Sequence, residues 1–171
     1  MKHKELMDAA NLVSSENKKD IARGLATAVS IEQESIDFYS RWAKKVSNPN
    51  AKNFFNFLVI QEQGHLEAIN ELKASIESDG SWVLPKMPKE DFSPFAPADW
   101  DKGEENAVTA VLFALWKERE AREFYFKVAA GVIAPNGKKF FELLAAFEQE
   151  HADFLGEYVE ESFYSNELIM G

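Results

Sequence analysis

Apolar residues recur at intervals of three and four positions along four long segments of the chain. This spacing places them on one face of an α-helix, whereas the alternation typical of a strand never persists. Turn-forming residues separate the segments, with Asn-Pro-Asn at 48–50, Asp-Gly at 79–80 and Pro-Asn at 135–136. The pattern predicts an all-α protein with helices over about 20–46, 51–76, 104–130 and 137–163, preceded by a short amphipathic helix over 3–13.

Residues 78–103 carry four of the six prolines, at positions 85, 88, 94 and 97. This composition predicts a linker without regular structure. The linker divides the chain into one helical hairpin over about 20–77 and a second over about 104–163. With 171 residues, we expect one domain over 1–171 that buries a substantial core.

The two hairpins are copies of each other. When residues 28–71 are laid over 114–157 without a gap, 17 of the 44 pairs are identical. A repeat of 86 residues is too long for a solenoid unit and indicates a duplicated helical hairpin. Each copy keeps one Glu on its first helix and one Glu-x-x-His on its second.

Helical phase predicts that these acidic residues face the core. Glu32 and Glu118 fall within the apolar faces of the first helices, and the apolar face of 104–130 also includes Val108, Val111, Leu112 and Leu115. On the second helices the apolar faces are interrupted by Glu62, His65, Glu148 and His151.

Such a cluster requires compensating positive charge. A buried, unpaired carboxylate costs several kcal/mol or takes up a proton. The apolar faces hold no Lys or Arg that would match it, so metal cations are the simplest compensation. A single His on an apolar face is more often a hydrogen-bonded core residue, but the pattern occurs in both copies. His3 is not part of such a repeated Glu and His pattern, and we expect it to be solvated.

Composition narrows the chemistry. The chain has no Cys, so a metal would be held by oxygen and nitrogen, which favours iron or manganese without excluding zinc. The net charge of −10 argues against nucleic acid or an anionic membrane as a partner. No uncharged apolar run reaches 18 residues, and the N-terminal segment lacks the apolar core of a signal peptide. We therefore expect a cytoplasmic protein that does not span a membrane.

One Glu from each of two helices with Glu-x-x-His from the other two is the dinuclear carboxylate pattern of ferritin-like four-helix bundles. Within that superfamily the chain resembles the rubrerythrins over about 20–163. Their helix motif, a Glu followed seven residues later by Tyr with Phe before it, matches Glu32, Phe38 and Tyr39, and again Glu118, Phe124 and Tyr125. The resemblance implies two irons bridged by Glu62 and Glu148, with terminal ligands Glu32 and Glu118 and with His65 and His151 completing the two sites.

The chain departs from the family in two ways. Full-length rubrerythrins carry a Cys-rich rubredoxin-like domain that delivers electrons, so a chain without Cys implies an external donor such as a rubredoxin. Many also have an extra Glu three residues after the second terminal ligand, where this chain has Ala121. Glu34 and Glu120 are repeated but have the phase of a solvated face. Tyr39 and Tyr125 have two interpretations, as hydrogen-bond partners of the ligands or electron relays, and as plain core aromatics.

The function implied by the resemblance is that of an oxidoreductase whose di-iron centre reduces H₂O₂ or O₂. Two alternatives remain, a ferroxidase that handles iron as substrate and a metal-binding bundle without catalysis. Helices of about 27 residues are roughly 40 Å long, whereas the 26-residue linker can extend about 85 Å. The linker can therefore cross the bundle, or pass one hairpin to a second chain. We expect a homodimer.

Overall fold

The computed structural model describes residues 2–87, 90–95 and 105–167, with the side chains of 105–108 and 161–167 excepted. These residues form helices without any strand, in agreement with the predicted fold class. The helices are α1 (His3–Val13), α2 (Lys18–Lys45), α3 (Pro49–Ser78), α4 (Glu105–Gly131) and α5 (Pro135–Glu167).

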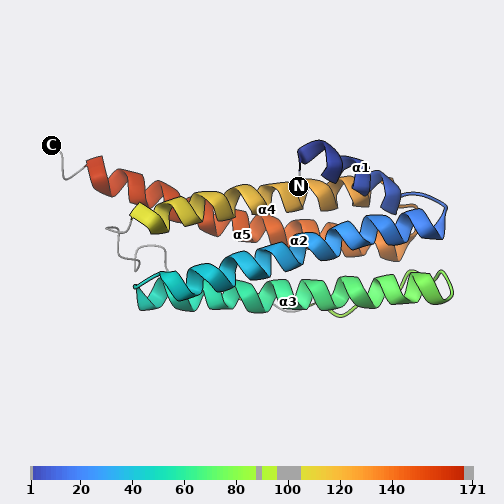
Figure 1. Ribbon diagram of the computed structural model, residues 1–171, viewed down its shortest axis with the longest axis horizontal. Helices are drawn as coiled ribbons and strands as arrows, with labels where there is room; N and C mark the ends of the chain where they lie inside the picture. The colour runs from blue at the N-terminus through green and yellow to red at the C-terminus, as the bar shows by residue number, and fades with distance from the viewer. Residues whose placement is uncertain (1, 88–89, 96–104, 168–171) are drawn as a thin grey trace.

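Helices α2 and α3 form one antiparallel hairpin, and α4 and α5 form the other (Figure 1). The first turn is set by Asn48, whose side chain accepts hydrogen bonds from the backbone N–H groups of Asn50 at 2.8 Å and Ala51 at 3.0 Å. Pro49 follows as the first residue of α3, where its missing N–H costs nothing. Pro135 opens α5 in the corresponding position of the second copy.

The end of α3 and the start of α4 lie at opposite ends of the bundle (Figure 1). The segment between them therefore returns along the length of the bundle, as the linker length allowed. Its described parts, 79–87 and 90–95, contain no helix or strand. One chain thus supplies both hairpins of a bundle, and the homodimer, with or without exchanged hairpins, stays a prediction.

The apolar core has two parts, one toward each end of the bundle. The first joins α1 to the other four helices, and α1 approaches α2 so closely that a Cβ on Gly24 would lie 2.8 Å from the backbone oxygen of Ala9. The second part is rich in aromatic residues, with Phe54 stacked on Phe154 at 4.5 Å. Between the two parts lie the buried polar side chains.

Helical phase misplaced one residue of α4. Leu112 was expected in the core but is 42% exposed, beside the exposed Phe113 and Trp116. The neighbouring Val111 and Leu115 are buried as expected, because the buried face of α4 is narrower at this point than the apolar face. The side chain of Val108 lies outside the described residues. Among the described helices, none is long and apolar enough to cross a membrane.

Candidate metal centre

Six buried side chains meet at the middle of the bundle. They come from all four long helices, none is more than 1% exposed, and they are Glu32, Glu62, His65, Glu118, Glu148 and His151. The structure thus brings together every residue that the sequence predicted as a metal ligand. Among the described residues no Lys or Arg is buried with them.

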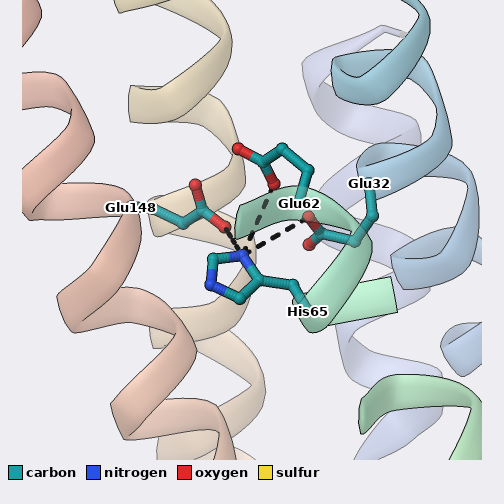
Figure 2. A group of neighbouring side chains, drawn as sticks. All are labelled: Glu32, Glu62, His65 and Glu148. Atoms are coloured by element: carbon teal, nitrogen blue, oxygen red, sulfur yellow. Dashed lines mark ion pairs between the residues drawn. The ribbon is translucent and has the colours of Figure 1, made fainter. Parts of the chain in front are cut away.

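One half of the cluster surrounds the Nδ1 atom of His65 (Figure 2). This nitrogen lies 3.4 Å from Glu62 Oε2, 3.5 Å from Glu148 Oε1 and 3.7 Å from Glu32 Oε2. The three carboxylates come from three different helices, and each presents one oxygen to the same small volume. The four residues form a group with the dimensions of a metal site.

The other half repeats this arrangement around His151. Its Nδ1 lies 3.2 Å from Glu62 Oε1, 3.5 Å from Glu148 Oε2 and 3.6 Å from Glu118 Oε2. Glu62 and Glu148 therefore belong to both halves, and each gives one oxygen to His65 and the other to His151. A carboxylate divided in this way has the geometry needed to bridge two ions.

The chemistry of the donors fits metal ions. Five residues of the cluster have buried atoms without a hydrogen-bond partner in the described structure, namely Glu32 Oε2, Glu62 Oε1, both oxygens of Glu148, His65 Nδ1 and His151 Nδ1. Unsatisfied polar atoms are rare in protein interiors because each costs free energy. Here they point at one another, and the four carboxylates and two imidazoles of the whole cluster match the ligand preference of iron or manganese.

The electrostatics of the cluster reflect this crowding. Burial, with the charge of Glu148 next in size, raises the pKa of both Glu32 and Glu118 well above the usual carboxyl range. Burial would also raise the pKa of Glu62, but its contacts with Glu32 and the two histidines outweigh burial and lower it well below that range. The raised pKa values favour protonation of Glu32 and Glu118. Protonation reduces the repulsion among the carboxylates, as bound cations would also do.

The histidines respond in the opposite sense to burial. Burial lowers the pKa of each imidazole, yet the surrounding carboxylates outweigh it and raise the pKa well above the usual value. Of the contacts that raise the pKa, the largest contribution comes from Glu148 for His65 and from Glu118 for His151. The site therefore attracts positive charge at both histidine positions.

Two tyrosines connect the hairpins at this point. The hydroxyl of Tyr39 on α2 donates a hydrogen bond to Glu118 on α4, and that of Tyr125 on α4 donates to Glu32 on α2. Burial, followed by the charge of Glu32, raises the pKa of Tyr125 well above its usual value, which keeps this hydroxyl a donor. Of the two interpretations left open by the sequence, the structure supports contact with the ligand carboxylates.

Sequence reasoning missed Glu90. This residue of the segment between α3 and α4 places its carboxylate on the outer side of both imidazoles, 2.8 Å from His65 Nε2 and 3.1 Å from His151 Nε2. Its side chain is 1% exposed. Burial would raise its pKa, but the hydrogen bonds with His151 and His65 outweigh burial and lower the pKa to about 2.

The other residues considered in the sequence lie outside the cluster. Glu34 is exposed, 3.7 Å from Lys117, and Glu120 lies at the surface, 3.6 Å from His3. His3 is mostly exposed, as expected, although it contacts these surface acids. Ala121 is buried and lines a small cavity of about 50 Å³ between α2 and α4.

A helical bundle with this set of inward carboxylates and imidazoles has the fold and the residue pattern of ferritin-like dinuclear carboxylate proteins. A protein-family model described as Rubrerythrin matches residues 23–159, most of the chain, and the chain belongs to this family. The buried cluster fits the di-iron site that is typical of rubrerythrins. Comparison with curated proteins and with solved structures gave no match.

Proposed function

We propose that the protein is a non-haem di-iron oxidoreductase that reduces H₂O₂, or O₂, with electrons from an external donor protein. The observation that carries this proposal is the division of Glu62 and Glu148 between the two histidine positions. It is supported by membership of the rubrerythrin family. Two bound irons would supply the electrons that reduce the oxidant.

The chain's own residues would hold and orient these ions. Glu62 and Glu148 would bridge them, Glu32 and Glu118 would each bind one ion, and the Nδ1 atoms of the histidines would complete the sites. The hydroxyls of Tyr39 and Tyr125 hold one oxygen of each outer carboxylate, so the other oxygen faces the cluster. The aromatic residues packed toward one end of the bundle help to exclude bulk water from the centre.

Peroxide reduction consumes two electrons and two protons and yields two molecules of water. Because the chain contains no Cys, electrons would come from a separate redox protein, for which a rubredoxin is the expected class.

The proposal is tested in two steps. Protein purified without oxygen should contain two iron ions per chain after loading with ferrous iron, as measured by elemental analysis. Stopped-flow mixing of this form with H₂O₂ and with O₂ should then show faster oxidation by peroxide, with more than one turnover when reductant is supplied. Faster oxidation by O₂ with net iron uptake would support a ferroxidase instead, and binding without turnover would support a non-catalytic metal protein.

A further inference from the structure

The two histidines share one hydrogen-bond partner on the side away from the carboxylate cluster. Their rings are nearly parallel, with centroids 5.7 Å apart and an angle of 18°. The Nε2 atom of each ring contacts a different oxygen of Glu90, which lies 25 residues from His65 and 61 from His151. One carboxylate thus contacts both copies of the repeated motif, although it has no counterpart in the repeat.

A neutral imidazole has one N–H donor and one acceptor nitrogen. A carboxylate beside Nε2 favours the tautomer that carries its proton there, because that proton is the only one the carboxylate can accept as a hydrogen bond. The lone pair of Nδ1 then faces the three carboxylates around each ring. This is the tautomer and ring orientation that a metal ion at either position requires.

We propose that Glu90 is a positioning residue for the metal centre, and that residues 90–95 are therefore a functional part of it. Its carboxylate holds both histidine rings with Nδ1 directed at the ions. The inference rests on the proposed metal centre and deepens it. Glu90 is not itself a ligand, because it lies behind the rings and belongs to neither four-residue group. Glu90 therefore does not replace the extra Glu that many rubrerythrins have at the position of Ala121.

The position of Glu90 is fixed by apolar packing on the residues that follow it. The ring of Phe92 lies 5.7 Å from that of His151, edge to face, and 5.4 Å from that of Phe154 on α5. Phe95 packs against Phe57 on α3 at 5.0 Å. The segment is thus held by both second helices, and Glu90 enters the core from a fixed backbone.

Coupling between the centre and this segment must act in both directions. If Glu90 improves metal binding, bound metal must equally stabilise the docked position of residues 90–95. The stability of residues 90–95 should therefore depend on whether metal is bound. These residues include the hydrogen bond from the backbone N–H of Phe95 to Phe92 O, at 2.9 Å.

The test uses Zn²⁺, which is not redox-active, with wild type and with the variants Glu90→Ala and Glu90→Gln. Affinity is measured by competition with a chelator, and the ring nitrogens of His65 and His151 are followed by ¹⁵N NMR. We expect affinity to fall about 10- to 100-fold in Glu90→Ala, with a shift of both Nε2 resonances. The affinity of Glu90→Gln, which keeps one acceptor oxygen, should lie between those of wild type and Glu90→Ala.

The matched control is Asp91→Asn, which removes a charge from the next residue but keeps the oxygen that accepts the Ser93 N–H at 3.0 Å. Its affinity and spectra should equal those of wild type. Amide exchange in residues 90–95 should slow when Zn²⁺ binds to wild type, and this slowing should be lost in Glu90→Ala. If Glu90→Ala does not fold, the same comparison is made with Glu90→Gln.

The outcomes separate the two proposals. If wild type binds fewer than two Zn²⁺ ions and fewer than two Fe²⁺ ions, the proposed centre is wrong and the role of Glu90 falls with it. If wild type binds two ions and the Glu90 variants match it in affinity and in ring-nitrogen shifts, the centre stands and only the role of Glu90 is overturned.

Discussion

The two halves of the proposed metal centre have the same types of candidate ligand but different surroundings. The ring of Phe147 on α5 stacks on His65, with centroids 5.3 Å apart and an angle of 17°. The position equivalent to Phe147 in the first hairpin is Gln61, which is buried and has an amide oxygen without a hydrogen-bond partner in the described structure. His151 instead meets the edge of Phe92, which comes from outside the repeat.

This difference shows which positions the duplication constrains. Glu62 and Glu148 belong to both halves, so a change in either would affect both proposed ions. The residues behind the rings differ between the two copies, with Phe147 against His65 and Phe92 against His151. We therefore expect two ions with the same ligand types but unequal affinities.

The largest effect should come from removing what the halves share. In a Glu62→Ala, Glu148→Ala double variant, both sites lose both bridging carboxylates, and metal content should fall from two ions per chain to none. Elemental analysis after loading measures this directly. The control is Glu71→Ala with Glu157→Ala, which removes a pair of repeated glutamates on the same helices that are exposed. Full metal content in the first double variant would falsify the assignment of the centre.

Removing a carboxylate that belongs to one half should separate the halves. Glu32→Ala should reduce metal content to about one ion, since Glu32 belongs only to the group around His65. Glu118→Ala should do the same for the group around His151. Competition titrations of the two variants then give the affinity of each remaining half. Loss of both ions in either variant would show that the halves cannot bind independently.

The tyrosines should contribute less, and equally. Tyr39→Phe and Tyr125→Phe each remove one buried hydrogen bond between the hairpins. Each should lower the free energy of unfolding of the metal-free protein by about 1–3 kcal/mol, because a buried carboxyl oxygen loses its donor. Urea unfolding measures both. If the two variants lose unequal amounts of unfolding free energy, the tyrosines also differ between the halves. If neither variant loses stability, the result contradicts the two hydrogen bonds.

The smallest expected change concerns the residues behind the rings. Phe147→Gln gives His65 the residue type that the first hairpin has at the equivalent position, and the lost ring contact is worth about 0.5–1.5 kcal/mol. We expect this variant to weaken binding at the His65 half severalfold and to leave the His151 half unchanged. Measured in the Glu118→Ala and Glu32→Ala backgrounds, the effect should appear in the first only. An equal effect in both would mean that Phe147 acts on the whole bundle.

Helical period was sufficient to predict the helices and the inward position of the six candidate ligands, because every one of them lies on a helix whose apolar face is visible in the sequence. It failed at Leu112, where an apolar residue extends beyond the buried face. It had no means of finding Glu90, since the segment between α3 and α4 has no period and its contact with His151 spans 61 residues. The hydroxyl contacts of Tyr39 and Tyr125 also depend on how the hairpins face each other, which neither hairpin determines alone.

The return of the chain along the bundle fixes the symmetry of the molecule. Since α3 ends and α4 begins at opposite ends, α2 and α4 run in opposite directions (Figure 1). The hairpins are therefore related by an approximate two-fold axis perpendicular to the bundle, and this operation exchanges Glu62 with Glu148 and His65 with His151. Two separate copies of one ancestral hairpin, paired about such an axis, would supply the same six side chains. The connecting segment joins the two hairpins covalently. They therefore pair within one chain at a high effective concentration, without the need for two separate hairpins to associate.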